Sequence, residues 1–144
     1  MRPQIYAWLL GLLAFAFFLR VVGQILVALD LAPFLPPMHA WYSGLVPYPL
    51  LLGSQIAILL LQVMISRDLG RGRGFFARPR RGFGRFLRGF GVVYLVVMIL
   101  RYILTMLWFP ELRWFTGIIP IFFHWVLATY VLVWSSYHRR AERL

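Results

Sequence analysis

The sequence of 144 residues contains no cysteine, lysine or asparagine, and only four acidic residues. The absence of cysteine excludes disulfide bonds, thiol nucleophiles, iron–sulfur clusters and covalent c-type haem attachment. The absence of lysine excludes a Schiff base with retinal or pyridoxal phosphate, and the absence of asparagine excludes N-glycosylation. The joint absence of lysine and asparagine is typical of a GC-rich bacterial coding sequence.

Hydrophobic residues make up 62% of the sequence, which is too apolar for a soluble domain of this length. They form four long runs, at residues 5–29, 48–66, 90–109 and 115–137. A helix of about 20 apolar residues crosses a hydrocarbon core of about 30 Å, so each run can span a membrane. The sequence therefore predicts an all-α integral membrane protein, with residues 1–144 forming one transmembrane domain and a four-helix bundle.

The first run has some features of a cleaved signal peptide, since Arg2 precedes it and small residues occur at Ala14 and Ala16. The run is longer than a signal peptide needs and continues through Arg20, which favours a membrane span. In the fourth run, Pro120 predicts a kink or a late helix start, because proline fits only the first turn of a regular helix.

The segment between the first two runs, residues 30–47, contains several prolines, which exclude one continuous helix. Its aromatic residues, with the first residue of the next run, are Phe34, Trp41, Tyr42 and Tyr48. Amphipathic rings of this kind gather at the level of lipid headgroups. We therefore expect a loop at the membrane surface, with at most a short helix over residues 37–43.

The most basic stretch of the chain is residues 67–89, between the second and third runs. Besides Arg67, seven of its arginines are expected at the membrane surface: Arg71, Arg73, Arg78, Arg80, Arg81, Arg85 and Arg88. Its glycines argue against a long regular helix, and arginine mixed with phenylalanine is typical of a segment that rests on anionic lipid headgroups. An Arg/Gly-rich RNA-binding segment has a similar composition, but about 20 residues tethered between helices offer little room, so we expect no nucleic-acid partner.

The arginines also predict how the spans are oriented. Arg2, the arginines of residues 67–89 and the three arginines after the fourth run lie on one side, against Arg113 alone on the other. Positive residues are retained on the cytoplasmic side of a membrane. We therefore expect an up-down-up-down bundle in a bacterial inner membrane, with both termini in the cytoplasm.

Polar residues within the apolar runs predict a binding site near the outer surface. Four of them are expected at one depth: Arg20, Gln55, Arg101 and His124. Each lies eight residues, or about 12 Å, from the outer end expected for its span. Those ends are near Ala28, Pro47, Phe109 and Thr116. An arginine at the membrane centre costs about 2.5–3.5 kcal/mol, so we expect both arginines to face the bundle interior.

Three further polar residues extend these faces. Gln24 and Thr105 lie one turn outward of the arginines on their own spans. On the second span, Gln55 and Gln62 are seven residues apart, so they share a face that should point at neighbouring helices.

Acidic residues are missing from all four apolar runs. The nearest outer acids, Asp30 and Glu111, lie ten residues beyond the arginine of the same span, about 15 Å along a helix. Unless the outer loop folds inward, the guanidinium groups need an anion from elsewhere. The sequence thus predicts an outer-leaflet pocket for an anionic amphipath such as a lipid, an isoprenoid phosphate or a quinone-like molecule. Its expected ligands are Arg20, Gln24, Gln55, Arg101, Thr105 and His124.

Three alternatives stay open. In the first, the arginines pair with acids of a membrane-protein partner or a second copy, as in an accessory or assembly subunit of a larger complex. In the second, His124 ligates haem with His39 or a methionine, but a bis-histidine site normally uses two helical histidines, so no cofactor is expected. In the third, Ser54 and His124 support catalysis; without an orienting acid or a metal-ligand cluster, the sequence favours a non-enzymatic protein.

Overall fold

The computed structural model describes residues 2–42, 44–113 and 118–140, and the secondary structure there is helical. The four long helices are α1 (Pro3–Ala28), α2 (Tyr48–Arg71), α3 (Arg81–Trp108) and α4 (Ile119–Arg139). Two short 3-10 helices, η1 (Met38–Ala40) and η2 (Pro110–Arg113), lie between them. All four long helices are long and apolar enough to cross a membrane, which confirms this part of the sequence prediction.

Prolines and one glycine mark the helix ends. A proline lies in the first turn of α1, α2 and α4, where the missing N–H group costs no helical hydrogen bond. Helix α4 begins at Ile119, so Pro120 marks a helix start rather than a kink. The start expected at residue 115 and the outer end expected at Thr116 lie outside the described residues. Gly72 ends α2 in a left-handed conformation with φ of 63°.

Helices α2 and α3 both extend into the stretch that the sequence indicates as an irregular loop. Helix α2 continues to Arg71 and α3 begins at Arg81, which leaves residues 72–80 as the connection between them. We call residues 72–80 the basic loop. The expectation that glycines exclude a regular helix throughout this stretch is therefore wrong.

The glycines of α3 pack against α4 instead of breaking the helix. A Cβ atom added at Gly84 would lie 2.9 Å from Cβ of His138, and one added at Gly91 would lie 2.8 Å from Cδ2 of Leu132. Real Cβ atoms do not come this close to other heavy atoms. Small residues spaced along one face therefore let α3 and α4 approach closely, as is common between membrane helices.

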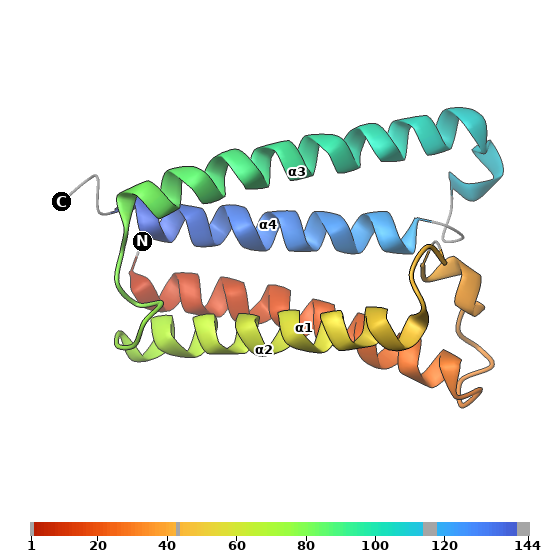
Figure 1. The fold of residues 1–144 in the computed structure, drawn as a ribbon, viewed down its shortest axis with the longest axis horizontal. Helices are drawn as coiled ribbons and strands as arrows, with labels where there is room; N and C mark the ends of the chain where they lie inside the picture. The colour runs from red at the N-terminus through yellow and green to blue at the C-terminus, as the bar shows by residue number, and fades with distance from the viewer. Residues whose placement is uncertain (1, 43, 114–117, 141–144) are drawn as a thin grey trace.

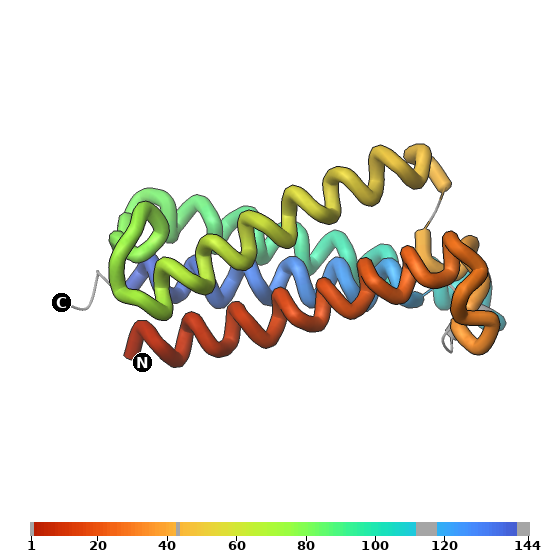
Figure 2. The backbone as a smooth tube through the Cα atoms, turned by 90° about the horizontal axis from the view of Figure 1, so that it is seen from below, coloured from red at the N-terminus to blue at the C-terminus, as the bar shows by residue number. Residues whose placement is uncertain are grey.

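Helices α1 and α4 form the middle of the bundle, because each packs against two other long helices. Figure 1 shows α4 between α3 and α1. Helix α1 packs against α2 and α4, and α4 packs along the length of α3. Figure 2 shows that α1 and α2 diverge as they approach the segment 29–47. Helices α2 and α3 therefore flank the bundle and expose most of their apolar side chains.

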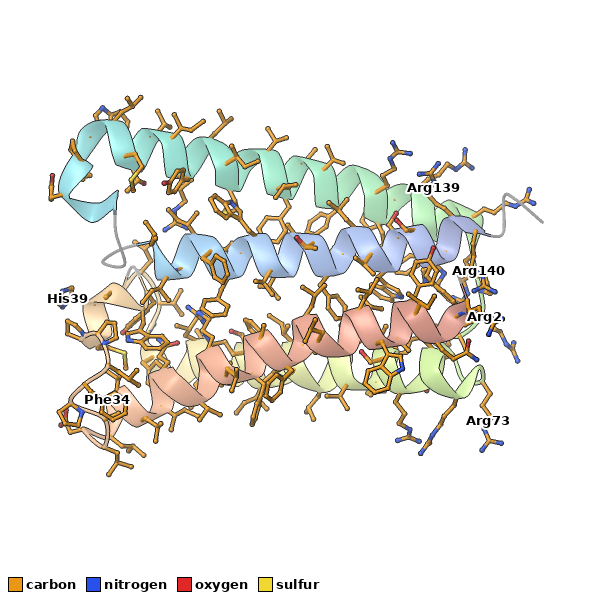
Figure 3. All side chains as sticks on the ribbon, turned by 180° about the vertical axis from the view of Figure 1, so that it is seen from behind. Arg2, Phe34, His39, Arg73, Arg139 and Arg140 are labelled. Carbon is orange, nitrogen blue, oxygen red and sulfur yellow. The ribbon has the colours of Figure 1, made fainter. Side chains whose placement is uncertain are left out.

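The two ends of the bundle differ in chemistry. The N-terminus, the C-terminal end of α4 and the basic loop lie together at one end, and the connections after α1 and α3 lie at the other (Figure 1). Figure 3 shows Arg2, Arg73, Arg139 and Arg140 at the first end, which we call the arginine-rich end. Phe34 and His39 lie at the opposite end, which we call the proline-rich end.

The apolar core joins all four helices. Its buried residues are Tyr6, Leu10, Ala14, Ile65, Leu69, Leu87, Tyr130, Trp134 and Tyr137. The hydroxyl of Tyr130 donates a hydrogen bond to the carbonyl oxygen of Gln62 at 3.0 Å, which connects α4 to α2. Gln55 and Gln62 are both buried, so the predicted inward orientation of this polar face is confirmed.

Candidate functional site

Arg20 is a buried cation within a membrane-length helix, eight residues before its end at Ala28. Its side chain is only 8% exposed, and Nη2 donates a hydrogen bond to the carbonyl oxygen of Trp41 at 2.9 Å. The guanidinium carbon lies over the ring of Phe123 on α4, 5.6 Å from the centroid. The burial of this side chain confirms the inward orientation expected from the sequence. Its Nε has no hydrogen-bond partner among the described residues, so the donors of Arg20 are only partly satisfied.

Two buried glutamines lie beside Arg20. Nε2 of Gln55 donates to Oε1 of Gln24 at 3.3 Å, and Nε2 of Gln24 lies 3.8 Å from the sulfur of Met38 in η1. Gln24 is completely buried and Gln55 is 3% exposed, while Oε1 of Gln55 has no hydrogen-bond partner in the part of the chain that the structure describes. We call Arg20, Gln24 and Gln55 the polar cluster. It joins α1, α2 and the segment that follows α1.

The segment 29–47 folds back onto α1 and completes the surroundings of the polar cluster. Trp41 is 6% exposed, and its indole Nε1 donates to the carbonyl oxygen of Pro36 at 2.9 Å. The ring covers Gly23, where an added Cβ would lie 2.8 Å from Cη2 of Trp41. Trp41 therefore packs inside the protein. The sequence had instead suggested a position among lipid headgroups. Phe34, at 85% exposure, keeps the position expected of a surface aromatic residue.

Tyr48, like Trp41, lies near the polar cluster, although the sequence suggested a position at the membrane surface for both. Its hydroxyl group is buried and has no hydrogen-bond partner within the described ranges, and its ring lies within electrostatic range of Arg20. Arg20 donates its hydrogen bond to a backbone carbonyl group. Asp30, the acidic residue nearest to it in α1 and the following turn, is exposed. The segment 29–47 folds inward, but it brings a carbonyl group rather than a carboxylate to the arginine.

Arg101 does not face the bundle interior, which corrects the expectation from the sequence. Its side chain is exposed on α3, and Oγ1 of Thr105 donates to the carbonyl oxygen of Arg101 at 2.8 Å within the same helix. The reason is that α3 packs chiefly against α4 at the edge of the bundle, so most of its surface is uncovered. Arg101 and Thr105 are therefore separate from the polar cluster.

His124 occupies the interface between α4 and α3. Its Nδ1 shares a hydrogen bond of 2.5 Å with the hydroxyl of Tyr94, and the two rings meet edge to face. His124 therefore lies between α3 and α4, whereas the polar cluster joins α1, α2 and the segment that follows α1. Ser54 is exposed on α2 and donates to the carbonyl oxygen of Leu51 at 2.7 Å, so it and His124 have different partners.

The basic loop packs against the C-terminal end of α4. The hydroxyl of Tyr137 donates to the carbonyl oxygen of Ala77, and the backbone N–H of Arg80 donates to Nδ1 of His138 at 3.1 Å. At the start of the loop, a carboxylate oxygen of Asp68 accepts from the N–H of Phe76 at 3.2 Å. The loop is thus held by protein contacts, which the sequence composition did not indicate.

The arginines around the basic loop remain on the surface. All seven arginines predicted for the membrane surface are exposed: Arg71, Arg73, Arg78, Arg80, Arg81, Arg85 and Arg88. The guanidinium group of Arg80 lies 4.4 Å from the ring centroid of Phe75. Phe76 and Phe83 instead contact Trp134, so the phenylalanines of this stretch divide between the protein and its surface. Arg143, from the expected polar tail, lies outside the described residues.

Metal binding finds no support in the described part of the chain. Across residues 2–42, 44–113 and 118–140, no three histidine, aspartate or glutamate side chains come together as a group that could hold a metal ion. His39 is exposed in η1 at the proline-rich end, whereas His124 is engaged with Tyr94. The chain matches no known protein family, and no curated protein or solved structure is detectably similar to it.

Proposed function

We propose that this chain is a small polytopic protein of a bacterial inner membrane that binds an anionic amphipath at the polar cluster. The bundle runs up-down-up-down, and the arginine-rich end with both termini faces the cytoplasm, because positive residues are retained there. The polar cluster then lies in the outer leaflet. Its ligand is a lipid, an isoprenoid phosphate or a quinone-like molecule.

The observation that carries this proposal is a buried guanidinium group that has no carboxylate partner in the described part of the chain. Arg20 is 8% exposed, donates to one carbonyl group and has an unsatisfied Nε. Burying a charge without full pairing is costly, and guanidinium binds phosphate and carboxylate groups through paired hydrogen bonds. An anionic headgroup at this position supplies the missing charge.

Two further unsatisfied groups fit the same headgroup. Among the described residues, Oε1 of Gln55 is a free acceptor within the polar cluster, and the hydroxyl of Tyr48, in electrostatic range of Arg20, can donate or accept. A ligand with phosphate oxygens and a hydroxyl group, or with quinone carbonyl groups, would use these atoms together with the guanidinium. The cluster offers fixed donors and one charge, so it supports binding rather than acid–base catalysis.

The test is to purify the protein in mild detergent and identify its bound lipids by mass spectrometry. We expect one amphipath to be enriched in the native protein and reduced about tenfold or more in Arg20→Gln, since hydrogen bonds to a charged group contribute about 1.5–3 kcal/mol. Arg20→Lys keeps the charge but loses the planar fork, so it should retain an intermediate amount. Arg88→Gln, which removes an exposed arginine of α3, should retain the full amount.

An unchanged lipid content in Arg20→Gln would contradict the proposal, provided that the melting temperature shows that the variant is folded. A loss of the same size in Arg88→Gln would also contradict it, because net charge and not the polar cluster would then control binding.

A second function is favoured by the exposure of Arg101. The side chain is exposed on α3 among exposed apolar neighbours, including Leu100 and Leu104, and an arginine in contact with lipid is costly. A transmembrane helix of another protein that carries a carboxylate would pair with it, which makes the chain an accessory or assembly subunit. In that case Arg101→Gln should lose a stoichiometric partner on affinity purification from its membrane, whereas Arg20→Gln should keep it.

A further inference from the structure

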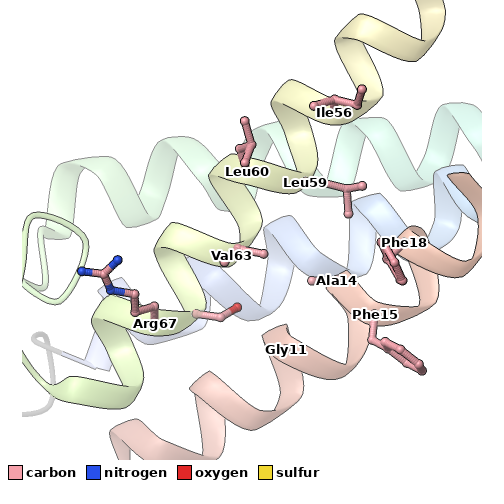
Figure 4. Close-up of a pocket in the computed structure, with 10 residues that line it drawn as sticks. Gly11, Ala14, Phe15, Phe18, Ile56, Leu59, Leu60, Val63 and Arg67 are labelled. Atoms are coloured by element: carbon pink, nitrogen blue, oxygen red, sulfur yellow. The ribbon is translucent and has the colours of Figure 1, made fainter. Parts of the chain in front are cut away.

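An apolar groove runs along the outside of the bundle between α1 and α2. It is lined by side chains from Gly11 to Phe18 of α1 and from Ile56 to Val63 of α2, and it ends at Ser66 and Arg67 (Figure 4). Its volume is about 610 Å³, within the range of about 300–1,000 Å³ that is usual for small-molecule sites. The groove does not include any residue of the polar cluster.

The groove arises from how the two helices approach each other. They are close at Gly70, where an added Cβ would contact Cβ of Ala7 at 3.6 Å. Beyond this point the helices diverge toward the proline-rich end (Figure 2). At Gly11 an added Cβ would have no heavy atom within 4 Å, so the wall of the groove is open there.

The length of the groove fits one leaflet of a membrane. Along α2 it extends from Ile56 to Arg67, which is about 16 Å at the rise of a regular helix. That is roughly half of a hydrocarbon core of about 30 Å. The groove therefore fits an extended chain that begins at one membrane surface and ends near the midplane.

The polar groups at one end of the groove show which kind of molecule it fits. Arg67 lies at the arginine-rich end of α2, one turn before Arg71, and its side chain is exposed. Ser66 lines the same end, and its buried hydroxyl group has no hydrogen-bond partner among the described residues. All other lining residues are apolar. An apolar channel with a cation at the surface end complements a molecule with a hydrocarbon chain and an anionic head.

We infer that the groove is a second binding site, which holds one acyl chain of an anionic phospholipid from the leaflet at the arginine-rich end. The phosphate group binds Arg67, and the chain lies along α1 and α2 over Gly11. The site is independent of the polar cluster, which lies nearer the opposite end of the same two helices.

The test measures lipid binding by native mass spectrometry while phosphatidylglycerol or phosphatidylcholine is titrated into the detergent-purified protein. Gly11→Leu places a side chain in the open part of the groove and should weaken phosphatidylglycerol binding about tenfold. Gly53→Leu is the matched control, because Gly53 is also a glycine within a helix with no heavy atom near an added Cβ, and it does not line the groove. It should bind like the native protein.

A second pair of variants tests the role of the charge. Arg67→Gln should abolish the preference for phosphatidylglycerol over phosphatidylcholine, while Arg71→Gln should keep it, since Arg71 does not line the groove. Equal losses in Arg67→Gln and Arg71→Gln would overturn the proposal, because a diffuse attraction to positive charge would then be sufficient. Full binding in Gly11→Leu would overturn it as well.

The polar cluster supplies a check that separates the two sites. Gly11→Leu should weaken phosphatidylglycerol binding by the same factor in the native protein and in Arg20→Gln, whatever ligand the polar cluster holds. If Arg20→Gln and Gly11→Leu abolish the same binding event, there is one site and not two, and the assignment of the groove is wrong.

Discussion

At the scale of single residues, the close approach of α3 to α4 depends on Gly84 and Gly91. Gly91 faces Leu132 so closely that any side chain would overlap it. We expect Gly91→Leu to destabilise the protein by about 1–3 kcal/mol, as overpacked substitutions do, and to lower its melting temperature in detergent.

Gly89 provides the control for this prediction, because it lies in the same helix and an added Cβ there has no neighbour within 4 Å. Gly89→Leu should leave the melting temperature unchanged or raise it slightly, since glycine is a poor helix former. If Gly91→Leu is as stable as Gly89→Leu, the two helices are not in close contact at this point.

The buried polar residues of the candidate site could be predicted where the free-energy cost of exposing them to lipid decides their orientation. Arg20, Gln24 and Gln55 interrupt apolar runs, and lipid exposure of such groups is unfavourable, so an inward orientation could be expected. Arg101 meets the same criterion and is nevertheless exposed. The free-energy cost of lipid exposure favours an inward orientation only where a helix has neighbours on its polar face. Helix α3 packs chiefly against α4, so part of its surface has no neighbouring helix.

Trp41 shows a different limit of sequence reasoning. A tryptophan in a proline-rich segment has the composition of a membrane-surface anchor, yet its ring packs over Gly23 of α1. The signal that could have identified this contact is a glycine inside an otherwise bulky helix, next to Gln24. A glycine at such a position leaves room for a large side chain from elsewhere in the chain.

At the scale of elements, the basic loop is connected to α4 by side chains from the last turn of that helix. Tyr137 donates to the carbonyl oxygen of Ala77, and the hydrogen bond between them contributes about 0.5–1.5 kcal/mol. We expect Tyr137→Phe to open the loop more often and to increase the rate of trypsin cleavage after Arg73 or Arg80 by about two- to tenfold. The measurement is the rate of limited proteolysis of the folded protein.

Ser136→Ala is a suitable comparison, because Ser136 is exposed and its hydroxyl donates to the carbonyl oxygen of Leu132 within α4. Its cleavage rate should equal that of the native protein. A rate in Tyr137→Phe that also equals the native rate would mean that this hydrogen bond does not restrain the loop.

The number and approximate position of the helices could be predicted because apolar runs, prolines and Gly72 are local signals. The extension of α3 back to Arg81 could not, since glycines in a connection and glycines in a helix interface have the same composition. What distinguishes them is spacing along one helical face, and Gly84 and Gly91 are seven residues apart. This spacing becomes meaningful only when the partner helix is known.

At the scale of the whole molecule, the absence of native cysteine makes the proposed orientation directly testable. His39→Cys places a thiol at the proline-rich end and Arg73→Cys places one in the basic loop at the other end. In intact cells, a membrane-impermeant maleimide should label His39→Cys and should label Arg73→Cys only after the membrane is permeabilised, because positive residues stay in the cytoplasm.

Labelling of Arg73→Cys in intact cells would reverse the orientation and move the polar cluster to the inner leaflet. Labelling of both variants in intact cells would indicate a mixed population. The native protein, which has no thiol, provides the background for both measurements.

The divergence of α1 and α2 has a consequence for how a ligand enters and leaves. At the arginine-rich end, the helices meet at Ala7 and Gly70, close to the tyrosines and leucines of the core. At the other end, an amide hydrogen bond of 3.3 Å between Gln24 and Gln55 joins them. A small swing of α2 about the tight crossing would break that bond while leaving the core intact, so exchange with the bilayer is expected from the side and needs no unfolding.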